Sequence, residues 1–485
     1  MKNQLLLGFL LLCAPAFAQE TVYQDFEVDS AAYPRGGMAY LNTFLQTNLR
    51  KPIVAESKGI GGRVSVSGIV DTDGRVSDVK AIPTKFPKLD REAVRVVSLF
   101  NAWQPAEKGG KVVRQRVNIP VMFKPNAPFL YVNDARISYY DADQKLLADS
   151  SDLAKFKQVA PTETDGLPNG DIIIFQQKRQ DWKEYYRLIF SRKKSVRRSP
   201  SDKAVFTIGI QQANGQWQGR VVDVDKAGNL VNQSFYTNGE RTGYELDYHP
   251  NGLVAQRTDH TDSLKTISSW YPNGQIKQIW AITKNKSMST SNPDHITTFW
   301  DSTGRQFVNE GSGSITYRES VRSFSDTTRQ TPFVEQGRYA DGFKQGVWIG
   351  RYADGSYNYE ERYEKGICQG GKAITAGSDT VRYAVREQQP EFSGGMQGLG
   401  MFLMQNLRYP ADAQRARAQG RVFISFVVCT DGTLCDYEVL KGVHPELDQE
   451  AVRVVKAMSG RWKPGIQRGQ KVRVKYNLPI NFTLQ

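Results

Sequence analysis

The sequence predicts an α+β fold at both ends of the chain and a mainly β region between them. Three observations support this prediction: the two ends repeat each other, each repeat alternates helical and strand patterns, and glycines recur at a fixed spacing in the middle. We expect each end to form a small three-stranded antiparallel sheet with two helices. The middle is expected to form stacked β-hairpins.

The repeated ends cover residues 34–124 and 387–485, which we call the first copy and the second copy. Their residues match at a constant offset of 358 positions up to a one-residue gain, and at 359 positions after it. Such agreement in register indicates a duplicated domain. The matches include Asn48-Leu49-Arg50 with Asn406-Leu407-Arg408, EAVRVV at 92–97 and 450–455, Asp73-Gly74 with Asp431-Gly432, Trp103 with Trp462, and Pro120 with Pro479.

The spacing of apolar residues predicts the elements of each copy, shown here for the second. A first helix is expected from about Gly395 to Arg408, ended by Pro410. Two antiparallel strands follow, Val422 to Val428 and Leu434 to Leu440, around the Asp431-Gly432 turn. A second helix and a final, half-buried edge strand complete the copy, carried by the stripe Leu447, Ala451, Val454, Val455 and Met458 and by the alternating Val472, Val474, Tyr476 and Leu478.

Glycines divide residues 206–375 into short units. Asn214-Gly215 to Ala227-Gly228, Asn238-Gly239 to Asn251-Gly252, and Asp341-Gly342 to Asp354-Gly355 are each 13 residues apart. Aromatic and β-branched residues alternate loosely between them, which indicates successive hairpins with glycine turns. Residues 125–205 contain strand-like runs such as Asp171 to Phe175 but no motif, and we expect them to be β-rich.

The chain opens with a segment typical of export. Lys2 precedes a largely apolar stretch of 13 residues, Leu5 to Phe17, which ends in the A-x-A-like Ala16-Phe17-Ala18. We therefore expect residues 1–18 to be a cleaved signal peptide and the chain to be periplasmic, with association to the outer membrane open. A transmembrane anchor needs about 20 apolar residues, and a lipoprotein signal would need small residues before Cys13, where Leu10 to Leu12 stand.

The net charge is +14, or +13 once Lys2 is removed with the signal peptide. In an exported protein this excess favours anionic envelope components over nucleic acid as partners. Beyond the signal peptide, the cysteines are Cys368, Cys429 and Cys435. A three-residue loop of Asp431, Gly432 and Thr433 would set Cys429 directly opposite Cys435, and export permits a disulfide between them. Two unpaired thiols or a redox pair are the alternatives, although C-x5-C is not a redox motif.

No catalytic, cofactor or metal site is predicted. The four histidines, His249, His260, His295 and His444, do not stand at metal-ligand spacing from one another or from cysteine. The sequence has no nucleophile elbow, phosphate loop or zinc-protease motif. It therefore favours a non-catalytic protein without a cofactor.

The second copy contains an ordered set of motifs: Arg408-Tyr409-Pro410, Gly420 to Ile424, Asp431-Gly432, Arg461 to Pro464 and Leu478 to Phe482. Taken together and in order, they resemble the TonB C-terminal domain family. The first copy departs from them at Lys51, in the place of Tyr409, and at Gln104, in the place of Lys463. Residues 214–275 and 337–371 resemble the MORN-type repeats of exported bacterial proteins.

The TonB resemblance implies that each copy binds a short extended segment of an outer-membrane transporter, or of another envelope protein, by adding it to the sheet as a strand. An exposed sheet edge also permits a homodimer. The residues expected at this edge are Val472, Val474, Tyr476 and Leu478 in the second copy and Val112, Val113 and Val117 in the first.

Three functions stay open at this point. The chain is a periplasmic adaptor that docks transporters in TonB-dependent transport, an envelope scaffold that binds peptidoglycan or other envelope proteins, or an energy transducer anchored by an uncleaved amino-terminal segment. The family's transducers reach an inner-membrane motor through a long proline-rich span, and the 21 prolines of this chain form no such run.

Overall fold

A computed structural model describes residues 21–148, 150–179, 181–196, 204–283, 295–326, 328–377 and 380–484. The predicted signal peptide lies outside the described residues, as does Cys13. The chain forms two compact units, Met1–Asn292 with Ile296–Phe307 and Pro293–His295 with Val308–Gln485, and each is considered by itself. In the part of the chain that the structure describes, no helix combines the length and the apolar character needed to cross a membrane.

The first copy is an α+β domain, and its main sheet has the strand order β1-β7-β3-β4 with β6 also paired to β7. The prediction of three strands and two helices was therefore wrong in detail, because short segments without an apolar pattern add β1, β6 and α2. The elements are β1 (Val22–Tyr23), η1 (Asp25–Glu27), β2 (Tyr33–Pro34), α1 (Met38–Asn48), α2 (Ile53–Ser57), β3 (Gly62–Val70), β4 (Val76–Ala81), α3 (Pro87–Ser98), β5 (Trp103–Gln104), β6 (Ala106–Lys108) and β7 (Lys111–Phe123).

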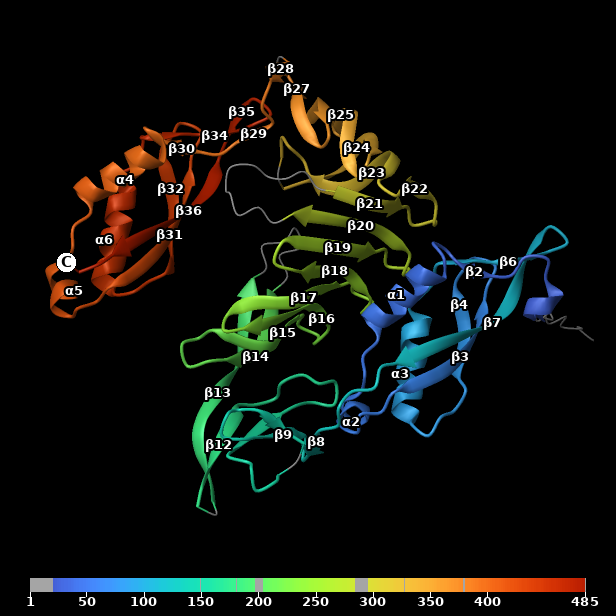
Figure 1. Cartoon of the computed structure of the whole chain (residues 1–485). Helices are drawn as coiled ribbons and strands as arrows, with labels where there is room; N and C mark the ends of the chain where they lie inside the picture. The colour runs from blue at the N-terminus through green and yellow to red at the C-terminus, as the bar shows by residue number, and fades with distance from the viewer. Residues whose placement is uncertain are drawn as a thin grey trace, which may run out of the picture. The chain divides into compact units, whose positions relative to one another are not determined.

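The described residues between 130 and 309 form antiparallel strands, most of which pair with the next strand along the chain, so that β11 to β20 make one meander (Figure 1). The strands are β8 (Leu130–Val132), β9 (Ala135–Tyr140), β10 (Leu146–Leu147), β11 (Phe156–Pro161), β12 (Ile172–Lys178), β13 (Asp181–Val196), β14 (Ala204–Gln211), β15 (Trp217–Val224), β16 (Leu230–Thr237), β17 (Glu240–Tyr248), β18 (Val254–His260), β19 (Leu264–Trp270), β20 (Ile276–Thr283), β21 (His295–Trp300) and β22 (Gln306–Asn309). The predicted hairpins are present. The likeness to MORN repeats stays a prediction.

Four turns on one side of this meander share the same geometry. In each, the first residue's N–H donates to the carbonyl of the fifth residue, and the glycine N–H donates back to the carbonyl of the first. The glycine has a positive φ, between 80° and 88°, which a residue with a Cβ rarely adopts. We call these turns the turn rim: residues 225–229, 249–253, 271–275 and 301–305.

The first copy packs against the turn rim. A Cβ on Gly274 would lie 3.1 Å from the rings of Phe44 and Phe100, so both rings rest on the bare glycine. The Asn48 side chain accepts a hydrogen bond from Val254 N at 2.8 Å, and Arg50 donates to the Gly252 carbonyl at 3.1 Å. Helix and sheet residues therefore share one core, to which Leu41, Phe44, Leu253, Val254, Trp270 and Ile276 contribute.

The second unit begins with the rest of the hairpin region, in which β23 to β28 again pair in chain order. Its core is mainly tyrosine and other aromatic residues rather than aliphatic ones. These strands are β23 (Ser312–Arg322), β24 (Gln330–Ala340), β25 (Phe343–Tyr352), β26 (Tyr357–Glu364), β27 (Ile367–Thr375) and β28 (Val381–Tyr383).

The second copy follows, with a main sheet of order β32-β31-β36 and two small sheets, β29-β34-β35 and β30-β33. As in the first copy, a short extra helix precedes the first long strand. Its elements are β29 (Glu387–Gln388), β30 (Glu391–Phe392), α4 (Gly395–Asn406), α5 (Ala411–Arg415), β31 (Gly420–Val428), β32 (Leu434–Lys441), α6 (Pro445–Lys456), β33 (Trp462–Lys463), β34 (Gly465–Gln467), β35 (Gln470–Val472) and β36 (Val474–Phe482). The predicted apolar stripe is the buried face of α6, and Leu447, Ala451, Val454, Val455 and Met458 are fully buried.

We expect Asn48→Ala to destabilise the first unit by about 1–3 kcal/mol, because the buried N–H of Val254 loses its acceptor. Hydrogen exchange followed by mass spectrometry should show faster exchange at residues 249–256. Asn406→Ala is the control, because the half-buried Asn406 occupies the matching position of the second copy. It should lower the free energy of unfolding by clearly less. Equal effects of the two substitutions would contradict the packing described here.

Candidate functional site

The last strand of the second copy has an open edge. β36 pairs with β31 through nine consecutive residues, from Val474 with Val428 to Phe482 with Gly420, and the ladder has no irregularity. Among the described residues, no strand of this sheet lies on the other side of β36. A row of backbone donors and acceptors is therefore unpaired within the sheet along this strand.

Pro479 indicates which residues face outward. Proline has no N–H, so it is tolerated in an edge strand where its nitrogen points away from the ladder. Since the direction of the backbone groups alternates along an antiparallel strand, Lys475, Asn477 and Asn481 share the outward direction of Pro479. Asn477 lies near the middle of this row, and its side chain is exposed.

The opposite edge of the same sheet, β32, is less regular. Its ladder with β31 shifts register twice, and Asp436 has a φ of 52°. Bulges of this kind twist an edge strand away from a would-be partner. The geometry therefore favours β36 over β32 as the edge that accepts a further strand.

In the first copy the chain covers the beginning of the equivalent edge, chiefly through β1, since β6 has a counterpart in β34 of the second copy. β6 pairs with β7 at Lys111 to Val113, and β1 pairs with it in parallel at Arg114 and Gln115. The Gln115 side chain is buried, accepts a hydrogen bond from Ala32 N and donates one to Asp25. An incoming strand would have to displace residues 22–32 from this end of the edge.

The far end of the β7 edge is capped by side chains. Gln46 donates to the Met122 carbonyl at 3.1 Å, and Lys51 donates to the Lys124 carbonyl at 2.9 Å. In the second copy these two positions hold Met404, which has no donor, and Tyr409, whose hydroxyl donates to Ala418 O instead. The two copies therefore share a fold but differ in how far the edge is open.

The predicted edge residues fall into two groups. Val112 and Val113 already pair with β6, and Val472 pairs with Gly465 of β34, so these three have a strand partner within the chain. Val117, Val474, Tyr476 and Leu478 lie on β7 or β36, where β3 or β31 occupies one side only. Sequence reasoning missed the outward Asn477, and Pro479 is the signal that could have identified it.

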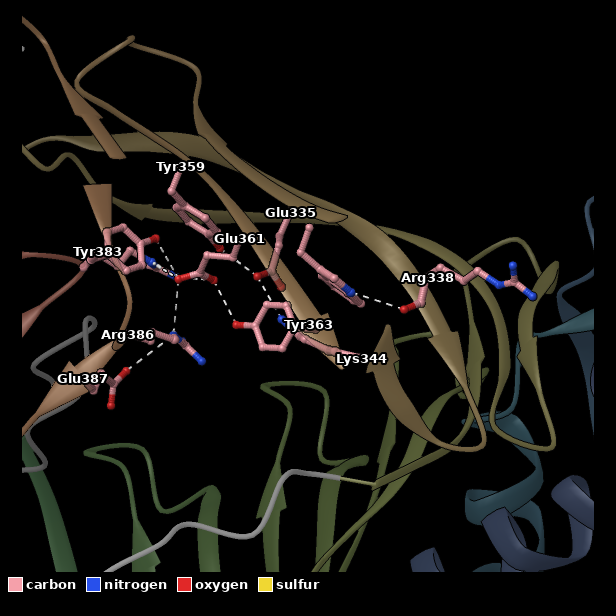
Figure 2. A network of polar contacts seen from close by, with 11 residues as sticks. Glu335, Arg338, Lys344, Tyr359, Glu361, Tyr363, Tyr383, Arg386 and Glu387 are labelled. Carbon is pink, nitrogen blue, oxygen red and sulfur yellow. Dashed lines mark hydrogen bonds and ion pairs between the residues drawn. The ribbon is translucent and has the colours of Figure 1, made fainter. Parts of the chain in front are cut away.

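The hairpin that leads into β36 is fastened to the hairpin region of the same unit by a buried polar network (Figure 2). Arg468, at the tip between β34 and β35, donates to the Glu361 carboxylate of β26 at 2.8 Å. Tyr383 and Tyr363 donate to the same carboxylate at 3.0 and 2.9 Å. The Arg468 guanidinium also lies 3.6 Å from the ring centre of Tyr359.

A second carboxylate extends the network along the sheet. Glu335 accepts hydrogen bonds from Tyr359 at 2.7 Å and from Lys344 at 2.9 Å, and the Lys344 ammonium lies 3.9 Å from the centre of the Trp348 ring. Burial alone would raise the pKa of Glu361, but hydrogen bonding and charge from Arg468 outweigh it and lower that pKa. The carboxylate is therefore ionised and paired at neutral pH.

A polar groove lies where β35 passes into β36. It is lined by Glu387 to Gln389 on one side and by Ile466, Gln467 and Val472 to Lys475 on the other. A strand added to β36 would run its end into this groove.

Cys429 and Cys435 lie at the turn between β31 and β32, and their thiols are free. The expectation that they stand directly opposite each other was wrong, because Cys435 pairs with Val427 and Cys429 N donates to Thr433 O. The two side chains still meet diagonally, and a hydrogen bond with Cys429 raises the pKa of the Cys435 thiol. Arg473, beside the groove, donates to the Cys435 sulfur at 3.2 Å.

The disulfide stays a prediction, and the chain offers its own control. In glutathione buffer of increasing oxidising ratio, we expect Cys429 and Cys435 to lose their reactivity toward an alkylating reagent together, because their side chains are in contact. Cys368 should stay reactive. Mass spectrometry of alkylated peptides makes the measurement, and independent behaviour of the two thiols would contradict the pairing.

We expect Glu361→Gln to destabilise the junction between β34–β35 and the hairpin region by about 3–5 kcal/mol, because it leaves the charge of the buried Arg468 uncompensated. Limited proteolysis and hydrogen exchange at residues 465–472 would detect the release. Glu438→Gln, which removes the exposed partner of Lys475, should cost less than about 1 kcal/mol.

The lowered pKa of Glu361 adds a pH test of the same contact. A carboxyl group with a depressed pKa in the folded state stabilises the fold above its unfolded pKa of about 4.3, and this contribution is lost as the pH falls toward the folded value. The junction should therefore weaken only in acid below about pH 4. The Glu361→Gln variant should lack this acid step, and an unchanged step would assign it to other groups.

Comparison with known proteins agrees with the duplicated architecture. The model of the family described as Gram-negative bacterial TonB protein C-terminal matches residues 48–125 and 405–484. Solution NMR structures of the Helicobacter pylori TonB C-terminal domain are similar to part of the chain. The one of residues 179–285 is 23% identical, with 19% of this chain and 82% of that chain covered and a TM-score of 0.16. The one of residues 194–285 is 24% identical, with 18% and 91% covered and a TM-score of 0.15. None of the curated proteins matches the chain. Two regions of the chain, one near each end, thus match the model of the TonB C-terminal family.

Proposed function

We propose that this chain is a non-catalytic envelope protein of the TonB type, and that its second copy docks an extended segment of an outer-membrane protein along β36. The observation that carries the proposal is the nine-residue ladder of β36 with β31, which leaves its other side without a strand in the described sheet. Backbone hydrogen bonds along such an edge hold a peptide with little dependence on its sequence.

The first copy supports a different role. Its edge is covered at one end by β1 and capped at the other by Gln46 and Lys51. Its helix α1 and residues 48–50 are engaged by the turn rim. We infer that the first copy is a structural support for the hairpin region and that the second copy is the one that binds partners.

The groove beside the start of β36 supplies selectivity. Its lining combines Glu387 with Arg473 and Lys475, and several glutamine side chains lie between them. A segment with polar or charged residues at the end that reaches Val474 fits this lining, because buried charges need partners of opposite sign or hydrogen-bonding amides. The match of this region to the TonB C-terminal family model favours segments of outer-membrane transporters as the partner class.

The test compares one position in the two copies. A photo-crosslinking residue in place of Asn477 should capture outer-membrane proteins in living cells, while the same residue in place of Asn118 should capture little or nothing. Both asparagines are exposed on the outward side of the last strand, so the probes are matched. Mass spectrometry identifies the captured proteins. Capture of cell-wall fragments alone at position 477 would support an envelope scaffold instead.

We expect Asn477→Pro to reduce capture by a crosslinker at Lys475 about tenfold or more, because proline removes an outward donor and leaves the ladder to β31 intact. Asn118→Pro, at the matching position of the first copy, should leave that capture unchanged. Circular dichroism and thermal unfolding would verify that both variants stay folded. Undiminished capture by a folded Asn477→Pro chain would contradict docking along the β36 edge.

A further inference from the structure

We propose that the outer face of α4 in the second copy is a second interaction surface, which receives an exposed glycine turn from the hairpin region of another molecule of the same chain. The inference goes beyond docking at β36 and uses a different face of the domain. It is argued from the first copy, in which the matching face of α1 already holds turns of this kind.

In the first copy, the matching face of α1 binds the turn rim through hydrogen bonds and ring packing. Asn48, the last residue of α1, turns its amide nitrogen to the Phe44 carbonyl and its oxygen to the backbone N–H of Val254. Two residues later, Arg50 donates to the carbonyl of Gly252 in the adjoining turn. Asn48 as acceptor and Arg50 as donor thus bind the backbone of one turn. The Phe44 ring packs on the glycine of the next turn, Gly274.

The second copy keeps this arrangement. Asn406 donates to the Phe402 carbonyl at 2.8 Å, as Asn48 does to Phe44 at 2.9 Å. Arg408 and Phe402 stand at the positions of Arg50 and Phe44.

The same pair of a buried glutamate and an arginine, Glu450 with Arg453 or Glu92 with Arg95, holds the backbone of the face in both copies. Arg408 N donates to Glu450, and Arg453 donates to the Asn406 carbonyl. In the first copy, Arg50 N and Arg95 make the equivalent bonds to Glu92 and to the Asn48 carbonyl. The backbone that carries Asn406 and Arg408 is therefore held by the same hydrogen bonds as the backbone that carries Asn48 and Arg50.

The two copies differ in how far the side chains of this face are buried. Phe44 and Asn48 are buried, whereas Phe402 and Asn406 are only half-buried and Arg408 is exposed. Met404 and Met401 are 77% and 55% exposed on α4, where the first copy has Gln46 and Thr43. In the first copy these two polar side chains face Arg257, Asp259, Ser268 and Trp270 of the sheet across a hollow. Exchange of two polar residues for exposed methionines suits a face that closes on a partner, since methionine adapts to irregular apolar surfaces.

The occupant must offer a glycine turn that nothing else covers. Of the turn rim, residues 249–253, 271–275 and 301–305 are engaged by the first copy, through Arg50, Phe44 and Arg35. The turn at 225–229 is exposed from Lys226 to Asn229, whereas Gly252 and Leu253 of the engaged turn are half-buried and buried. Its hydrogen bonds repeat those of the 249–253 turn, and both are followed by the same irregularity, at Val224 with Leu230 and at Tyr248 with Val254. Gly228 and Leu230 of another molecule would therefore take the places of Gly252 and Val254.

The contact joins two different surfaces, so its symmetry follows. If two molecules exchange the contact reciprocally, a closed dimer results, and if they do not, the contact extends into longer assemblies. In either case the association involves α4 and leaves the β36 edge free, so that docking and self-association are separable.

The experiment uses the full chain as a mixture of unlabelled and uniformly nitrogen-15-labelled molecules, with a photo-crosslinking residue in place of Met404. Crosslinked peptides that join a labelled to an unlabelled partner come from two molecules. We expect such mixed pairs to join position 404 to the peptide that contains residues 225–230. Pairs confined to one molecule, or mixed pairs that map elsewhere, would overturn the proposal.

Sedimentation velocity over a range of concentrations gives the second readout. We expect dimers or larger species for the unaltered chain, and a dissociation constant raised about tenfold or more by Met404→Glu and by Arg408→Glu. Met122→Glu, a methionine that is 50% exposed on the first copy, is the matched control and should have no effect. A chain that is monomeric at every concentration would overturn the proposal, whatever the crosslinker at Asn477 captures.

Discussion

This structure depends on how its antiparallel sheets treat the unpaired backbone groups of their edge strands. Such groups are either covered by the protein itself or paired with a partner. Each copy ends in a long strand, β7 or β36, that has a neighbour on one side along its length. The first copy covers both ends of its edge, one with β1 and the other with the side chains of Gln46 and Lys51. The second copy leaves nine residues of ladder open, which is a liability unless a partner occupies them.

Duplication makes the difference between the copies informative, because the same position is seen in two contexts. Gln46 caps a carbonyl at the end of β7 and is replaced by Met404, which has no donor. Lys51 binds the end of β7, and its counterpart Tyr409 bonds within its own domain. The pairs Glu92–Arg95 and Glu450–Arg453, in which the glutamate is buried, by contrast have the same geometry in both copies, with nitrogen to oxygen distances of 2.7 Å. Residues that hold the fold are kept, whereas residues that decide what the edge and the outer helix face contact have changed.

The sequence predicted what depends on local pattern. The stripe of α6, the strands around Asp431-Gly432 and the glycine turns all follow from spacing within a few residues, and the structure has them. β1 was missed because this strand has only two residues, Val22 and Tyr23, which pair with residues more than 90 positions away. The diagonal placement of Cys429 and Cys435 was missed because it depends on the register of a bulged ladder, which turn length alone does not determine. The hydrogen bond between Arg468 and Glu361 joins a loop to a strand 107 residues away in the sequence. No periodic pattern in the sequence predicts such a contact.

The bond between Arg468 and Glu361 also makes the junction beside the open β36 edge polar. An apolar contact is non-directional and would permit several placements of the β34–β35 tip against β26. The Glu361 carboxylate instead accepts from Arg468, Tyr363 and Tyr383, and these donors together define one position of the tip. β36 begins directly after this hairpin, so a strand that pairs with it bears on a fixed element rather than on a loose one. We infer that the hairpin region of this unit serves as the support against which the open edge is presented, and that the ionic contact is kept for its geometry, since a buried ion pair by itself adds little to stability.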